Sequence, residues 1–343
     1  MSGAFLSNPD LLPVIFGLNG TTLSAAERDF FHDTNPLGFI LFARNCDSPV
    51  QLKRLVATLR DSVGRSDAPI LIDQEGGRVA RLKPPHWPAY PAPAAIAALG
   101  GLAAREAAWL VGRLIADDLA QLGITVDCAP VLDIPVADAD PIIGDRAWGD
   151  TARSVIEHGL AVCDGLLAGS VLPVLKHVPG HGRGTVDSHL ALPVVATSLA
   201  TLDSIDFVPF RALAGMPWAM TAHILYSELD PDRPATLSAR VIGEAIRTSI
   251  GFDGVLISDD LSMQALGGGL AERARGALAA GCDLVLHCNG IMEEMSGIAT
   301  AIGPIRAEAA RRVAAGEARR RAPGGFDRFA AERRFAALLE GKV

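Results

Sequence analysis

The chain has 343 residues, of which 49% are apolar and 5% are aromatic, and its net charge is −8. It is long and apolar enough to bury a large core, either as one α/β barrel or as about two smaller domains. The acidic balance and the scarcity of aromatic residues argue against a nucleic-acid-binding protein, since such proteins usually carry a basic surface.

In chain order, short apolar runs alternate with helical patterns. Ser24 and Glu27 have the spacing of a capping box, which predicts a helix that begins there and ends near His32. The later helices are expected at Ser48–Gly64, Leu102–Gly123, Thr151–Gly169, Leu202–Ala214, Ala239–Ile250 and Leu270–Ala280. The apolar runs predict strands at Val14–Leu18, Gly38–Phe42, Pro69–Asp73, Ile124–Val131, Val171–Leu175, Trp218–Ile224, Gly254–Ile257 and Asp283–His287.

This alternation predicts the fold class. Strands that are nearly continuous apolar runs, each followed by a helix, are typical of a parallel sheet covered by helices. Eight of them favour an α/β protein with a single (β/α)8 barrel of the TIM type, spanning residues 1–343 with a helical C-terminal extension from about residue 303. We find no GxGxxG motif after the first strand and no P-loop, so nothing supports a nucleotide-binding open sheet. The arginine-rich segment Arg306–Arg321 is expected to be a solvated helix on the barrel exterior.

The N-terminus and the cysteines bear on location. The first basic residue is Arg28, so the N-terminus does not resemble a secretory signal, and no run of about 18 uncharged apolar residues predicts a membrane helix. The cysteines are isolated, without a CxxC pair, which fits neither a disulfide framework nor a zinc site; they are Cys46, Cys128, Cys163, Cys282 and Cys288. We therefore expect a cytoplasmic monomer that binds no membrane and no nucleic acid.

Polar residues follow six of the predicted strands. Because the active sites of α/β barrels lie at the carboxyl ends of the strands, we expect these side chains to converge on one pocket. They are Asp73, Arg78 and Arg81, then Asp133, Asp145 and Arg146, then Lys176 and His177, and finally His223, Asp259, Asp260, His287 and Asn289.

The segment Lys176–His189, with the sequence KHVPGHGRGTVDSH, concentrates chemically useful side chains in a loop rich in glycine. Asp187 stands two residues before His189, and a carboxylate beside an imidazole can fix its tautomer and stabilise its protonated form. With Asp259 as an ionised carboxylate at the end of the seventh strand, these residues provide a nucleophile and a proton shuttle. That combination is the logic of retaining glycoside hydrolysis.

A metal site is the alternative for the same residues. His177 and His181 have an i, i+4 spacing, and His189 and Asp259 could complete a set of ligands for a metal-dependent hydrolase. The intervening Pro179 and Gly180 argue against a helix that would present both histidines on one face.

The segment KHVPGHGRGTVDSH resembles the long signature of glycoside hydrolase family 3, and most closely that of its bacterial β-N-acetylhexosaminidases of peptidoglycan recycling. The segments IDQEGGRVARL, APVLDI, GDRAWG and GVLISDDLSM are also similar to that family, in the same order. The resemblance implies a (β/α)8 barrel that uses no metal and no organic cofactor.

The resemblance also implies roles for residues. Asp259 would be the nucleophile, and His189, paired with Asp187, the general acid/base. The N-acetylglucosamine ring would be bound by Asp73, Arg81, Arg146, Lys176 and His177. The expected substrate is a small sugar, N-acetylglucosamine β-linked to anhydro-N-acetylmuramic acid, with or without peptide. A family 3 phosphorylase, a metal-dependent barrel hydrolase and a non-catalytic sugar-binding regulator are the competing interpretations.

Overall fold

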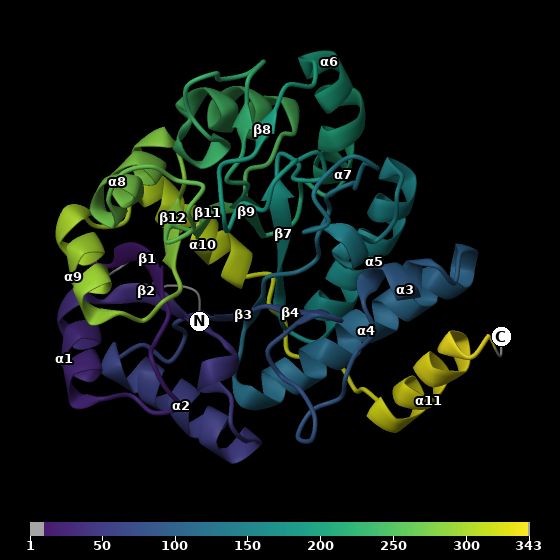
Figure 1. The fold of residues 1–343 in the computed structure, drawn as a ribbon. Helices are drawn as coiled ribbons and strands as arrows, with labels where there is room; N and C mark the ends of the chain where they lie inside the picture. Colours follow the sequence, from purple (N-terminus) through teal and green to yellow (C-terminus); the bar gives the residue numbers. More distant parts are fainter. Residues whose placement is uncertain (1–9, 342–343) are drawn as a thin grey trace.

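The computed structural model describes residues 10–341, in which eight parallel strands close into a barrel with helices around it (Figure 1). The predicted (β/α)8 fold is thus confirmed. Around the barrel the order is β1-β12-β11-β9-β7-β6-β3-β2. The strands are β1 Leu12–Phe16, β2 Pro36–Leu41, β3 Ile70–Ile72, β6 Val126–Asp127, β7 Leu172–Val178, β9 Trp218–Thr221, β11 Val255–Asp260 and β12 Leu284–His287.

The helices lie on the outside of the barrel (Figure 1). Ser24 caps α1 as predicted, since its side chain and that of Glu27 satisfy each other's backbone N–H groups. The helices are α1 Ala25–Thr34, α2 Pro49–Ser62, α3 Pro93–Ala97, α4 Gly101–Leu122, α5 Ala152–Ala168, α6 Leu199–Thr201, α7 Phe207–Ala212, α8 Leu270–Ala280, α9 Met292–Ala301, α10 Ala307–Glu317 and α11 Arg328–Leu339. Short 3-10 turns are η1 Ala43–Asn45, η2 Gly144–Arg146 and η4 Ala235–Leu237.

Two predicted helices differ in their winding. The expected helix at 202–214 consists of the π-helical η3 (Leu202–Asp206) and α7, with the short α6 directly before them. The helix expected at 239–250 is the π-helical η5 (Val241–Ser249). Two short strand pairs lie outside the barrel and were not predicted. They are β4 (Gln74–Gly76) with β5 (Val79–Ala80), and β8 (Val194–Val195) with β10 (Leu225–Tyr226).

The barrel interior is filled by apolar side chains that all eight strands contribute, among them Ile15, Leu71, Val174 and Trp218. Since the helices cover the outer faces, the strands are buried on both sides, which explains their continuous apolar sequences. Within residues 10–341, no helix is both long and apolar enough to cross a membrane.

The arginine-rich segment corrects one expectation, because α10 closes the barrel at its amino-terminal end. Ile305 donates a hydrogen bond from its N–H to Leu11 O just before β1, and Val313 packs into the interior cluster. Arg312 binds the buried Asp283 at 3.0 Å. The helix is therefore solvated on one face only, because its alanines, Val313 and Gly316 cover a core that would otherwise meet water.

Candidate active site

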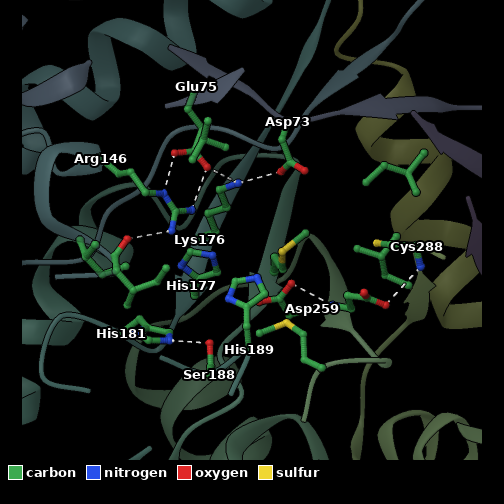
Figure 2. A pocket seen from close by; sticks show the side chains of 18 of the residues that line it. Asp73, Glu75, Arg146, Lys176, His177, His181, Ser188, His189, Asp259 and Cys288 are labelled. Atoms are coloured by element: carbon green, nitrogen blue, oxygen red, sulfur yellow. Dashed lines mark hydrogen bonds and ion pairs between the residues drawn. The ribbon is translucent and has the colours of Figure 1, made fainter. Parts of the chain in front are cut away.

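A cavity of about 250 Å³ opens at the carboxyl ends of the barrel strands (Figure 2). Small-molecule sites typically measure ~300–1,000 Å³, so this cavity lies slightly below that range. Seven of the eight residues predicted from the sequence line it: Asp73, Arg81, Arg146, Lys176, His177, His189 and Asp259. The eighth, Asp187, lies behind His189 and binds it.

One wall of the cavity is a cluster of ion pairs. Lys176, on β7, lies 2.9 Å from Asp73 Oδ1 and 2.6 Å from Glu75 Oε1. Arg81 binds the other oxygen of Asp73 at 2.9 Å. Arg146, on η2, donates two parallel hydrogen bonds to Glu75, from Nε at 2.9 Å and from Nη2 at 2.8 Å. Two carboxylates thus hold three cations in place. Figure 2 shows Lys176 between Asp73 and Glu75, with Arg146 on the far side of Glu75.

These groups are charged in spite of their burial. Burial raises the pKa of Asp73 and of Glu75, but the adjacent cations outweigh it, so both pKa values lie below the usual range. Burial also lowers the pKa of Lys176 and of Arg146, and here the adjacent carboxylates outweigh it and raise both values. The result is a rigid, ionised surface whose donors and acceptors are suited to a polar ligand.

Glu75 is the member of this cluster to which the sequence analysis gave no role. It lies in β4 within the IDQEGGRVARL segment, and its side chain is only 2% exposed. Counting charges could have identified Glu75 from the sequence. The predicted sugar-binding set contains the cations Arg81, Arg146 and Lys176 but a single carboxylate, Asp73. Buried cations need compensating charges nearby.

Asp259 is the penultimate residue of β11, and its side chain lines the cavity. Its Oδ1 accepts a hydrogen bond from the Asp260 N–H at 2.8 Å. Burial raises its pKa, but His177, His223 and this hydrogen bond outweigh that effect and lower it overall. Asp260 is turned to the loops, where its carboxylate accepts from the Ser262 N–H and hydroxyl and from the backbone N–H after His287.

The loop after β7 brings His189 to the rim of the cavity. His189 Nδ1 lies 2.7 Å from Asp187 Oδ1, and its backbone N–H donates to the same oxygen at 2.9 Å. Burial raises the pKa of Asp187, but the two bonds from His189 outweigh it and lower the value. Because a carboxylate can only accept, Nδ1 carries a proton, and the exposed Nε2 is left to face a ligand.

Hydrogen bonds among buried polar groups hold the rest of the loop between His177 and His189. Asp133 accepts from the His177 ring at 2.8 Å and from the His181 N–H at 2.6 Å. The His181 Nε2 lies 3.2 Å from the Ser188 hydroxyl, and burial lowers the pKa of His181 to about 4. His181 therefore supports the loop one residue before His189.

The prediction that all polar residues at the strand ends converge on the cavity is wrong for some of them. Asp133, Asp145, His223, His287 and Asn289 do not line it. Strand parity explains His287, because Leu284 and Leu286 face the barrel interior and His287 points to the opposite side. His223 follows the end of β9, and its ring is turned to the Asp260 carbonyl and the Thr236 hydroxyl.

The metal alternative has no support in the arrangement of the ligands. His177 and His181 point to Asp133 and Ser188, in different directions. Among residues 10–341, no group of three or more His, Cys, Asp or Glu side chains is placed to hold a metal ion.

Known proteins share this chain's sequence pattern. A sequence profile described as Glycosyl hydrolase family 3 N terminal domain matches residues 13–316. Proteins named Beta-hexosaminidase from Alkalilimnicola ehrlichii and Pseudomonas aeruginosa are each 40% identical to it. The first match covers 81% of this chain and 80% of the relative, and the second 80% and 82%.

Solved structures agree. NagZ from Neisseria gonorrhoeae, crystallised in complex with N-trifluoroacetyl-D-glucosamine, is 33% identical with a TM-score of 0.86, over 96% of this chain and 98% of that chain. A family 3 β-N-acetylglucosaminidase from Paenibacillus is also 33% identical, with a TM-score of 0.80, over 96% of this chain and 62% of that one.

Proposed function

The chain belongs to glycosyl hydrolase family 3 and is a glycoside hydrolase, and from this premise we propose that it is a retaining exo-β-N-acetylglucosaminidase. The observation that carries the proposal is that an ionised Asp259 and a His189 oriented by Asp187 line the same small cavity. A carboxylate nucleophile and a proton shuttle are the two groups that retaining hydrolysis needs. The β-hexosaminidase relatives and the sugar-bound neighbour support the choice of an N-acetylated hexose.

In the first step, an Asp259 oxygen attacks the anomeric carbon while His189 Nε2 donates its proton to the departing glycosidic oxygen. The C1–O bond breaks with its electron pair on that oxygen, and a covalent glycosyl-Asp259 forms. Asp187 stabilises the ring as an imidazolium before this transfer. In the second step, neutral His189 takes a proton from water, whose oxygen attacks the anomeric carbon and releases Asp259.

The ion-pair wall binds the sugar in this proposal. Asp73, Arg81, Arg146, Lys176 and His177 supply both donors and acceptors, which a ring with several hydroxyls and an acetamido group requires. Because the barrel core closes the floor and the cavity is small, it accepts one terminal sugar, and the rest of the substrate extends past His189. The substrate we propose is N-acetylglucosamine linked to anhydro-N-acetylmuramic acid, with or without peptide.

We further infer that the protein acts as a monomer in the cytoplasm. The nucleophile, the proton shuttle and the sugar-binding residues of the proposed site all belong to one chain, so one copy supplies every group that the mechanism uses. The five cysteines are free, which suits a reducing compartment.

The test is hydrolysis of 4-nitrophenyl N-acetyl-β-glucosaminide, with proton NMR to identify the anomer released first. We expect β-N-acetylglucosamine as the first product, no turnover by Asp259→Ala, and slow release by His189→Ala that is limited by the second step. Asp232→Asn, on an exposed loop, is the matched control and keeps full activity. Release of the α-anomer first, or activity in Asp259→Ala, would refute the mechanism.

Two further arms separate the competing chemistries. A histidine shuttle does not repel phosphate as a carboxylate would, so the reaction is repeated in phosphate buffer, where a phosphorylase forms the sugar 1-phosphate. It is also repeated with a chelator, where a metal-dependent hydrolase loses activity that zinc restores. We expect free sugar in both arms.

A further inference from the structure

His223 is a buried histidine to which the mechanism above gives no part. It follows β9 and is fully buried. Both nitrogens of its ring have partners: Nε2 lies 3.0 Å from the main-chain oxygen of Asp260, and Nδ1 lies 2.7 Å from the Thr236 hydroxyl. The Thr236 hydroxyl is in turn 2.7 Å from that of Thr221. Three strand and loop segments are thus linked by one chain of hydrogen bonds.

The chemistry of these groups determines which of them donates and which accepts in each hydrogen bond. A carbonyl oxygen only accepts, so Nε2 of His223 carries the proton and donates it to Asp260. In a neutral ring Nδ1 then accepts from Thr236, which accepts from Thr221. The Ala222 carbonyl lies farther from the Thr236 hydroxyl, at 3.2 Å, so the shorter bond to the ring takes the proton.

The surroundings of the ring favour this neutral tautomer. The titratable groups that face it are the carboxylates of Asp259 and Asp260 and the ring of His177. Burial lowers the pKa of His223 despite the two carboxylates. Protonation would make Nδ1 a donor and reverse or break the bond from Thr236, so the hydroxyls also resist it.

The chain of hydrogen bonds ends at Asp260, whose main chain holds the proposed nucleophile, Asp259. The Asp260 N–H donates to Asp259 Oδ1, and the carbonyl of the same residue receives the bond from His223. The Asp260 side chain is tied separately, to Ser262 and to the N–H of Cys288. The main chain of Asp260 is thus held by His223 at its carbonyl group, and its N–H group in turn orients the Asp259 carboxylate.

We propose that His223 is a positioning residue, which aims the Asp259 carboxylate at the anomeric carbon by holding the Asp260 carbonyl through Nε2–H. The inference rests on the proposed role of Asp259 as the nucleophile. Its consequence is specific, since the hydrogen bonds of the His223 ring go to Asp260 and Thr236 and not to the residues proposed to bind the sugar. The loss of His223 should therefore slow the attack and leave binding of the sugar unchanged.

Three substitutions separate the two nitrogens. In His223→Gln the amide nitrogen reaches the place of Nε2 and can donate to Asp260, in His223→Asn the amide reaches only the place of Nδ1, and His223→Phe keeps the volume and removes both. The first measurement is kcat/KM on the 4-nitrophenyl glycoside, because it reports the step in which Asp259 attacks. The second is the inhibition constant of N-acetylglucosamine, which reports binding alone.

We expect His223→Phe to lower kcat/KM about 10²-fold, the order of loss that a misplacement of about 1 Å causes. His223→Gln should recover most of this loss and His223→Asn little of it, while all three leave the inhibition constant unchanged. Thr236→Val, which removes the donor to Nδ1, should give a smaller loss in kcat/KM. Thr125→Val is its matched control, because that buried hydroxyl binds the Ile70 N–H away from the cavity.

Equal activity of His223→Gln and His223→Phe, or a parallel weakening of inhibitor binding, overturns the inference. If His223→Phe fails to fold, which its melting curve shows, the comparison of the Gln and Asn variants and the Thr236→Val loss decide instead. Asp259→Asn is measured beside them. Activity in that variant refutes the nucleophile itself, whereas an inactive Asp259→Asn with unaffected His223 variants refutes only the role of His223.

Discussion

Substitution of Glu75 by Gln tests whether the ion-pair wall is structural support for the sugar site. The carboxylate is 2% exposed; its Oε1 binds both Lys176 at 2.6 Å and Arg146 Nη2 at 2.8 Å, and its Oε2 binds Arg146 Nε at 2.9 Å. Glutamine keeps the shape but leaves Asp73 as the single carboxylate of the cluster. Removal of one partner from a buried ion pair typically costs ~3–5 kcal/mol, because the other charge stays buried. We expect a loss of that size in the free energy of unfolding.

The assay is urea unfolding at pH 7 together with the Michaelis constant on the 4-nitrophenyl glycoside. The Michaelis constant should rise, because Lys176 and Arg146 lose the group that fixes their positions. Glu106→Gln is the control, since Glu106 and Arg334 form a similar two-bond pair, at 2.7 Å each, on the exposed surface. Solvent screens that pair, so its loss should change little. If the two variants unfold alike and bind substrate alike, the reasoning about burial is wrong.

Three further predictions concern the loop and the base of the barrel. His181 has its pKa lowered to about 4 by burial, so its neutral form stabilises the fold above pH ~6.5, and stability falls as the pH drops from there to about 4; urea unfolding of His181→Asn should depend less on pH in that window. Gly182→Ala should lower kcat/KM strongly and the melting temperature only slightly, because the new Cβ would collide with the Ile134 carbonyl and displace the catalytic loop. Unchanged kinetics would show that the loop does not need the close contact between Gly182 and Ile134. Val313→Asp places a charge in the barrel interior and should lower the free energy of unfolding by on the order of several kcal/mol, measured by urea unfolding, whereas a neutral result would mean that α10 does not seal the core.

The barrel could be predicted because its sequence pattern and its physical requirement coincide. Each strand is buried on both faces, so each had to contain a short, continuous apolar run. Val255–Asp260 and Leu284–His287, for example, each begin with three apolar residues. The π-helical winding of Val241–Ser249 could not be predicted, because its apolar face resembles that of an α-helix. The burial of one face of α10 was missed because six arginines dominate the Arg306–Arg321 segment, while small alanines make the contact.

The candidate site was predictable where chemistry and position agreed in one segment. Asp187 and His189 lie close together in the sequence, so their pairing needed only a loop. Glu75 binds Arg146, which is 71 residues away, and no local pattern marks that contact. His223 was expected in the cavity, and its actual partners, Thr236 and Asp260, are 13 and 37 residues away, so no local pattern marks those contacts either.

The closure of the barrel has a consequence for how the chain is made. Val14 pairs with Val285, so the first strand has no neighbour on one side until β12, about 270 residues later, has been synthesised. Helix α10, whose Val313 packs into the barrel interior, is synthesised later still. A ribosome therefore exposes an incomplete sheet with an open, apolar edge for most of translation, and such edges pair with other chains. We expect the nascent protein to need chaperone protection until β12 and α10 have emerged.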